Sequence, residues 1–106
     1  MNIIYDSIIV GAGASGLMAA IQAARKGAHV LILEHMDRAG KKILSTGNGK
    51  CNFTNEKQGI AYYNGKNPAF VLPALRQFGV TETLQFFEEL GIYQKMKRDG
   101  YYYPAS

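Results

Sequence analysis

The order of apolar and polar residues over the first 34 positions predicts a strand, a helix and a second strand. Residues 3–10 form a nearly continuous apolar run, which is typical of a strand buried in a parallel sheet. Residues 14–26 carry an apolar stripe at helical spacing, made of Leu17, Ala20, Ile21 and Ala24. A further apolar run at residues 29–33 ends at Glu34. The pattern therefore predicts a β-α-β unit.

Glycines stand where the first strand passes into the helix, in the sequence GAGASG. Gly11 permits a tight turn, Gly13 lets the backbone approach a pyrophosphate, and Gly16 lets the helix pack close to the strand. The free N–H groups at the start of the helix then hold phosphates. Glu34 lies eighteen residues beyond Gly16, where its carboxylate can accept hydrogen bonds from ribose hydroxyls. The unit predicts a dinucleotide site, and the carboxylate argues against a 2′-phosphate.

Two helices are expected in the second half of the chain. The first covers residues 67–78, with a break near Val71 because Pro73 lies inside it. The second is expected to start at a Thr81 cap and to reach Leu90. The residues expected to face the core of this helix are Leu84, Phe87 and Leu90.

A β-hairpin is expected at the C-terminal end. Residues 92–98 and 101–103 flank Asp99-Gly100, a dipeptide that favours a hairpin turn. The three tyrosines at 101–103 could stack on a base or a flavin, but a half-buried strand explains them more simply.

Composition and charge add limits to this picture. The chain has 106 residues, 47% of them hydrophobic, which fits one globular domain at most. Its net charge of +4 resides at residues 37–66, where six Lys and Arg stand against two Asp and Glu. Such an excess marks a solvated face or an anionic partner. We expect no signal peptide, membrane span, disulfide or metal site, and a cytoplasmic location, because the chain has one cysteine and no basic N-terminal region.

Residues 40–55, GKKILSTGNGKCNFTN, combine three lysines, three glycines, three asparagines and the single cysteine. A P-loop is excluded, because its pattern would need glycine at Leu44 and a hydroxyl at Cys51. Nucleic-acid binding through the lysines stays open, although Phe53 is the only aromatic residue in the stretch. For Cys51, a packing role is the simpler alternative to a reactive thiol that Lys50 would activate.

GAGASG, Glu34 and this stretch together resemble the BaiN-type (YhiN-like) flavoproteins, also called aminoacetone-oxidase-like FAD enzymes. That family carries, after its ribose-binding acid, a run of the form G-[RK]-K, two hydrophobic residues, one variable residue, [ST]-G-[GN]-G-[RK]-C-N, one hydrophobic residue and [ST]-N. DGYYYPAS at residues 99–106 is similar to the family's D-G-R-x-[FY]-P-x-S segment. The resemblance covers essentially the whole chain.

The resemblance implies an α/β fold, the N-terminal part of a Rossmann-like FAD-binding domain of the glutathione-reductase-like superfamily. It places the cofactor against three groups of residues. These are Gly11, Gly13, Ala14, Ser15 and Gly16 at the pyrophosphate; Glu34 at the adenosine ribose, with Lys41 and Lys42 along the phosphate and adenosine side; and Thr46, Gly47, Asn48 and Gly49 near the ribityl chain or flavin ring. His35 is a further candidate, and a surface position after the strand is its simpler alternative.

Two predicted parallel strands are too few for a doubly wound sheet. The resembling proteins are several times longer, and later segments complete their FAD domain. We therefore expect residues 1–106 to be the N-terminal portion of an FAD-binding domain, with the remaining strands and a substrate domain outside this chain. Alone, the chain is expected to hold FAD weakly or not at all and to catalyse no reaction.

The function implied by the resemblance is that of a flavin-dependent oxidoreductase acting on a small organic substrate, with NAD(P)H as a reductant of the full-length enzyme. No catalytic residue can be named from the sequence. The expected partners are FAD and a small molecule, without nucleic acid or membrane. Two alternatives stay open: a fragment of an NAD-dependent dehydrogenase, and a non-catalytic module that binds dinucleotides or nucleic acid.

Overall fold

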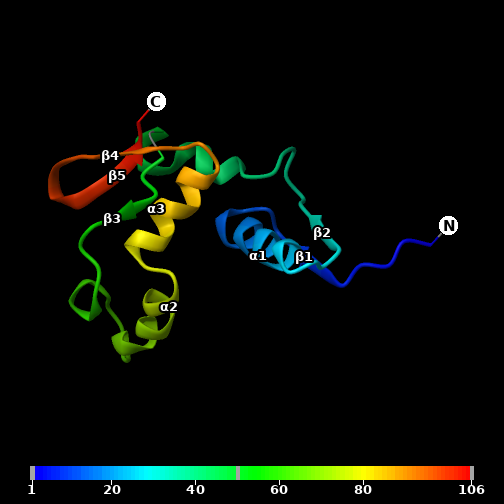
Figure 1. The fold of residues 1–106 in the computed structure, drawn as a ribbon, viewed down its shortest axis with the longest axis horizontal. Coiled ribbons are helices and arrows are strands. Elements are labelled where there is room, and N and C mark those ends of the chain that lie inside the picture. Colours follow the sequence, from blue (N-terminus) through cyan, green and yellow to red (C-terminus); the bar gives the residue numbers. More distant parts are fainter. Residues whose placement is uncertain (1, 50, 106) are drawn as a thin grey trace. The chain divides into compact units, whose positions relative to one another are not determined.

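The computed structural model describes residues 2–49 and 51–105, without the side chains of residues 47–49 and 98 (Figure 1). The chain divides into two compact units, Met1–Gly49 and Lys50–Ser106. Each unit is described by itself.

The first unit is the expected β-α-β arrangement. Strand β1 pairs in parallel with strand β2, so that Ser7 lies opposite Val30 and Val10 opposite Leu33, and the helix α1 connects them (Figure 1). The unit ends in a 3₁₀ segment, η1. Its elements are β1 (Ser7–Val10), α1 (Ala14–Arg25), β2 (Val30–Leu33) and η1 (Lys41–Gly49). The α/β fold class is confirmed, although β1 starts four residues later than residue 3, where the apolar run begins.

The second unit packs short helices beside a small antiparallel sheet. The sheet has the strand order β3-β5-β4. Its elements are β3 (Thr54–Asn55), η2 (Ile60–Tyr62), η3 (Pro68–Val71), α2 (Leu72–Gln77), α3 (Val80–Glu89), β4 (Gln94–Met96), η4 (Arg98–Gly100) and β5 (Tyr101–Pro104). The expected break in the first helix is confirmed, because η3 gives way to α2 directly after Val71 and Pro73 stands in the first turn of α2.

The start of helix α3 corrects the sequence interpretation. The helix begins at Val80, with Gly79 as its N-cap, and Thr81 already lies inside it. The Gly79 N–H group donates to Glu82 Oε1 at 2.9 Å, and the Thr83 hydroxyl donates to the Gly79 carbonyl at 2.8 Å. A Cβ at Gly79 would lie 2.9 Å from the Leu75 carbonyl oxygen. The helix therefore starts where the chain passes close to the end of α2, and side-chain capping propensity does not decide its position.

The core face of α3 also differs from the expected one. Phe86 is the buried side chain of this helix, and its ring meets both Phe78 and Phe87 edge-on. Leu84 and Phe87 are half-buried, but Leu90 is 54% exposed, so its predicted inward position is wrong. Leu90 follows the last helical residue, where the backbone leaves the helical path, and the 3.6-residue period no longer sets its direction.

The predicted hairpin is confirmed, and a third strand extends it. Asp99 and Gly100 both have positive φ, 62° and 78°, which Asp-Gly tolerates well at a turn. Strand β3 adds Thr54 and Asn55 to the β5 edge, opposite Tyr102 and Tyr101. The sequence analysis did not predict this strand.

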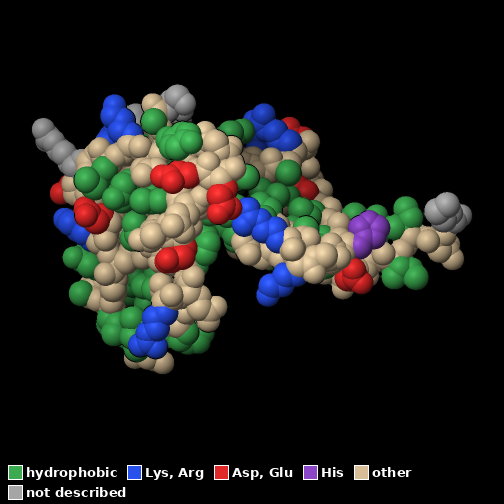
Figure 2. Space-filling view, viewed as in Figure 1, with side chains coloured by type: hydrophobic (Ala, Val, Ile, Leu, Met, Phe, Trp, Pro, Cys, Tyr) green, Lys and Arg blue, Asp and Glu red, His purple; other side chains and the backbone are tan. Residues whose placement is uncertain are grey.

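Apolar side chains lie open on the surface of the first unit's sheet. Ile8, Val10 and Leu33 are 57, 83 and 49% exposed, and Figure 2 shows apolar surface next to charged groups. The buried hydrophobic residues are few among those described: Ala12, Ala20 and Phe86. The faces of this two-stranded sheet are therefore partly uncovered among the described residues. Among the described residues, no helix has the length and apolar character needed to cross a membrane.

Candidate dinucleotide-binding site

The turn from β1 into α1 depends on two glycines for different reasons. Gly11 has φ +101° and donates its N–H to the Leu33 carbonyl at 2.7 Å, which ties the turn to the end of β2. At Gly16, an added Cβ would lie 2.0 Å from the Gly11 carbonyl oxygen. Gly16 therefore allows α1 to approach the strand, as its place in the fingerprint predicts.

The start of α1 is free of side chains that would block a ligand. Its N-cap is Gly13, which forms no side-chain cap, and the first turn holds no acidic residue. A Cβ at Gly13 would meet nothing within 4 Å. Among the described residues, the first turn of α1 thus presents its backbone N–H groups and the positive end of the helix dipole without a side-chain cap, an arrangement that suits a phosphate group.

Glu34 is held beside this turn by a bond across the fingerprint. Its Oε1 accepts the Ala12 N–H at 3.0 Å, whereas its Oε2 is buried and accepts no hydrogen bond within the described part of the chain. The ring nitrogen Nδ1 of His35 lies 3.7 Å from Oε2. A buried acceptor without a donor is the group that a ribose hydroxyl would satisfy. The sequence predicted that the Glu34 carboxylate accepts hydrogen bonds from ribose hydroxyls. In the structure the Ala12 N–H already occupies Oε1, so Oε2 is the oxygen that remains for a ribose hydroxyl.

Backbone N–H groups lower the pKa of Glu34. The Ala12 bond is the largest cause, and the N–H groups of Met36 and His35 act in the same direction, while partial desolvation opposes them. The carboxyl is therefore ionised at neutral pH, ready to accept hydrogen bonds from hydroxyl groups.

This lowered pKa predicts a defined acid response. We expect Glu34 to titrate below its ordinary value of 4.5, so that the Ala12 bond stabilises the fold above that pH and is lost as the pH falls through the lowered pKa. Carboxyl-carbon NMR between pH 7 and 2 measures the titration, and the Ala12 amide proton should shift with it. Glu34→Gln should remove both responses. A Glu34 midpoint at or above 4.5 would contradict the geometry.

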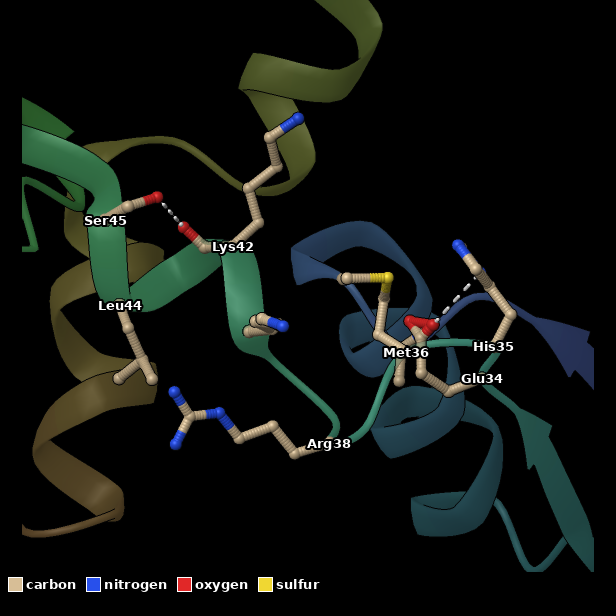
Figure 3. Close-up of a pocket in the computed structure, with 10 residues that line it drawn as sticks. Glu34, His35, Met36, Arg38, Lys42, Leu44 and Ser45 are labelled. Atoms are coloured by element: carbon tan, nitrogen blue, oxygen red, sulfur yellow. Dashed lines mark hydrogen bonds and ion pairs between the residues drawn. The ribbon is translucent and has the colours of Figure 1, made fainter.

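A cavity of about 700 Å³ opens beside Glu34 (Figure 3). Glu34, His35 and Met36 form one side of it, η1 forms the other, and Arg38 extends from the connecting loop toward η1. The loop is fixed at its base, because the Gly40 N–H donates to the Ala12 carbonyl at 2.7 Å. All residues that line the cavity belong to the first unit.

Three basic residues line this cavity and differ in how they are held. Lys41 pairs with Asp37 at 3.0 Å, so part of its charge is already neutralised. Arg38 and Lys42 are exposed and form no side-chain hydrogen bond or ion pair among the described residues. Arg38 and Lys42 are thus the cations available to an anionic ligand at this edge.

The structure gathers some predicted residues at the cavity and leaves others outside its lining. Gly13, Glu34, His35, Lys41 and Lys42 line it. Thr46 is exposed, and its hydroxyl donates to the Ile43 carbonyl at 2.9 Å. Gly47, Asn48 and Gly49 continue η1, but their side-chain surroundings are outside the described residues. The remaining predicted residues lie outside the cavity lining. Gly11 forms the turn between β1 and α1, and the first turn of α1 contains Ala14, Ser15 and Gly16.

Several residues of the cavity were missed by the sequence analysis. Met36 and Leu44 present apolar side chains that are 44 and 60% exposed, and Ala12 supplies the N–H for Glu34. Ser45 also lines the cavity. The available signal was the presence of two large apolar residues, Met36 and Leu44, in the mostly polar stretch after Glu34. Exposed apolar groups at a ligand site suit a flat ring.

Cys51 is half-buried and free, with φ 58°. Lys50, the residue considered as its activator, lies outside the described residues. No group of His, Cys, Asp and Glu among the described residues could hold a metal ion. The site is therefore one of backbone N–H groups, one carboxylate and neighbouring cations, the composition expected for a nucleotide cofactor.

A β-α-β unit with this glycine turn, an open helix N-terminus and an acid at the end of β2 defines a Rossmann-type dinucleotide-binding domain. The chain matches the HI0933-like protein Rossmann domain over residues 5–106, and it belongs to that family. The predicted family resemblance and the Rossmann-like α/β fold are confirmed.

Three relatives show the breadth of the match. The chain is 53% identical over 100 residues to the 3-dehydro-bile acid delta(4,6)-reductase of Clostridium scindens, covering 92% of this chain and 24% of the relative. It is 39% identical over 95 residues to the ribosomal RNA dihydrouridine synthase of Haemophilus influenzae, covering 90% and 24%. Over 44 residues it is 50% identical to Protein FixC of Escherichia coli, covering 42% and 10%. The chain spans about a quarter of the length of the first two relatives.

Proposed function

We propose that residues 1–106 form the N-terminal portion of the FAD-binding domain of a longer oxidoreductase, and that this portion holds the adenosine diphosphate half of the cofactor. The observation that carries the proposal is the Glu34 carboxylate beside the uncapped N-terminus of α1. Ala12 holds its Oε1, and its Oε2 accepts no hydrogen bond among the described residues. A phosphate at the helix and a ribose at Oε2 would satisfy both.

Each group of residues has a distinct role in this proposal. The N–H groups of Ala14, Ser15 and Gly16 bind the pyrophosphate, and Gly13 leaves room for it. Arg38 and Lys42 offset its charge, while Met36 and Leu44 supply apolar surface for the adenine. The 46–49 segment continues toward the ribityl chain and flavin ring. When bound, FAD supplies hydride transfer at its N5, and these residues supply binding and orientation.

The names of two relatives support a class of substrate. One is called a 3-dehydro-bile acid delta(4,6)-reductase, and the other a ribosomal RNA dihydrouridine synthase. Both names describe the addition of hydrogen to a carbon–carbon double bond in a ring that also bears a carbonyl group. We propose that the complete protein reduces a carbonyl-conjugated double bond of a small organic compound, with NAD(P)H as the reductant, in the cytoplasm.

A small-molecule substrate is preferred here over nucleic acid. Three of the first unit's basic residues, Arg38, Lys41 and Lys42, already line the cofactor cavity, and Lys41 also pairs with Asp37. RNA binding by the chain, measured against salt concentration, tests this preference. Binding that falls steeply with salt and is unchanged in Glu34→Gln would favour RNA instead.

A chimera tests the proposed function directly. The first quarter of the Clostridium scindens reductase is replaced by this chain, which is 53% identical to it. We expect the chimera to purify with bound FAD and to reduce a 3-oxo steroid with conjugated double bonds, while the 106-residue chain alone binds FAD weakly and shows no turnover. Folded chimera without flavin would contradict the proposal. The same chimera with Glu34→Gln serves as the control, and we expect less bound flavin in it.

A further inference from the structure

The tripeptide Asn-Gly-Lys occurs twice in this chain, at residues 48–50 and 64–66. An asparagine before a glycine loses its side-chain amide readily, because glycine has no Cβ to hinder attack by its own backbone nitrogen. In both copies the positive charge of the following lysine favours the deprotonated form of that nitrogen. The local sequence therefore gives the two copies nearly the same reactivity, and the structure has to distinguish them.

The other asparagines are poorer candidates. Each of them precedes a residue that carries a side chain or ring: Asn2, Asn52, Asn55 and Asn67. The residue after Asn67 is a proline, which has no N–H group. Asn55 is also held in place, because its Oδ1 accepts the Lys57 N–H at 2.8 Å and the Glu56 N–H donates to the Gly100 carbonyl at 2.7 Å.

The copy at residues 64–66 lies in exposed, irregular backbone. It belongs to the segment between η2 and η3, on the path from β3 to α2 (Figure 1). Asn64 and Gly65 are exposed, and no helix or strand includes them. The Gly65 N–H has no backbone hydrogen-bond partner among the described residues, and a Cβ at Gly65 would meet nothing within 4 Å. The attacking nitrogen is therefore free and open to solvent.

The copy at residues 48–50 begins inside a regular element. Asn48 and Gly49 lie in the 3₁₀ segment η1. In such a segment the N–H groups donate to carbonyls three residues earlier, and the backbone keeps helical dihedral angles. The Gly49 nitrogen can reach the Asn48 side chain only when the backbone leaves this conformation. Reaction at Asn48 therefore requires local opening of η1.

We propose that Asn64 is a site of spontaneous deamidation, modified faster than Asn48. The Gly65 nitrogen gives its proton to hydroxide and forms a bond to Asn64 Cγ, and the side-chain nitrogen leaves as ammonia. The product is a five-membered succinimide ring. Water then adds to one of its two carbonyls and breaks that C–N bond, which gives aspartate or isoaspartate at position 64. No electrons are transferred, and water is the one co-reactant.

The modification changes the second unit in two ways. The new carboxylate lowers the net charge of +4 by one. Isoaspartate also adds one carbon to the backbone of the link between η2 and η3, two segments that lie against each other. The proposal rests on the exposure and free nitrogen of this link and does not depend on the cofactor site.

Peptide mapping of the ageing chain by mass spectrometry tests the proposal. The 106-residue chain is kept at mildly alkaline pH, and samples are digested over several weeks. We expect the Asn64 peptide to acquire the mass of the acid roughly tenfold faster than the Asn48 peptide, because η1 must open first. The rate at Asn64 should rise with pH, since hydroxide takes the proton. In concentrated guanidinium, where η1 is lost, we expect the two rates to become equal.

Two matched variants complete the test. Asn64→Gln should stop the change at this position, because the longer side chain cannot close a five-membered ring, and the Asn48 rate should stay the same. Asn67→Gln should leave the Asn64 rate unchanged, since Asn67 is exposed and its side chain forms no cap for η3. The proposal is overturned if Asn64 stays intact, if Asn48 reacts as fast in the folded chain, or if the difference persists in guanidinium.

Discussion

Gly16→Ala is expected to destabilise the first unit more than any other single methyl addition in the glycine turn. The new Cβ would lie 2.0 Å from the Gly11 carbonyl oxygen and 3.1 Å from its carbon. Both are backbone atoms, so helix α1 must move away from β1 to relieve the collision. Overpacking typically costs about 1–3 kcal/mol, and we expect this case at the upper end. Urea unfolding followed by circular dichroism measures the loss.

Gly13→Ala is the matched control for that experiment. Gly13 has φ −82°, which alanine adopts without strain, and its Cβ would meet nothing within 4 Å. We expect its free energy of unfolding to stay within about 1 kcal/mol of the unaltered chain, since only a helix cap changes. Equal stability of the Gly16→Ala and Gly13→Ala chains would show that the close approach of α1 to the turn has been misjudged.

Glu34→Gln is expected to weaken ADP binding by roughly tenfold or more, because hydrogen bonds from ribose hydroxyls to a charged acceptor are stronger than those to an amide. Glutamine keeps the shape of the side chain and an oxygen for the Ala12 N–H. The change therefore removes charge and one acceptor while the turn is preserved. Titration of the chain with ADP at millimolar concentration, followed by NMR, measures the affinity.

A phosphorylated probe and a control variant sharpen this test. For 2′,5′-ADP we expect Glu34→Gln to strengthen binding, because loss of the carboxylate removes its repulsion of the 2′-phosphate. Glu56→Gln changes an exposed acid in the second unit and should alter neither affinity. A Glu34→Gln chain that binds ADP as tightly as before would remove Glu34 from the proposed ribose site.

Local patterns predicted much of the fold because their causes are local. The β-α-β unit follows from apolar periodicity, the break after Val71 from the missing N–H of Pro73, and the hairpin from the positive φ that Asp99 and Gly100 tolerate. The break and the hairpin turn need no contact from a distant segment, and the strands and helix of the β-α-β unit carry their own local patterns. The glycine fingerprint belongs to the same group, since the positive φ of Gly11 and the close approach of Gly16 to the Gly11 carbonyl involve residues near one another in the sequence.

Features that depend on contacts between separate elements were missed or misplaced. Strand β3 exists because Thr54 and Asn55 pair with β5, and α3 starts at Gly79 because the chain there touches the Leu75 carbonyl. Phe86 is buried, and its ring meets the rings of Phe78 and Phe87 edge-on. Tertiary packing overrides local propensity at such places.

The features of the candidate site also fall into two groups, those set by local sequence and those set by tertiary contacts. The sequence by itself determined the glycine turn, the acid at the end of β2 and the basic stretch after it, because residue type and spacing define them. Only the tertiary structure decided that Ala12 occupies one oxygen of Glu34 and leaves the other unpaired, and that Met36 and Leu44 line the cavity. Those facts arise from contacts between segments far apart in the chain, whose geometry a one-dimensional pattern does not contain.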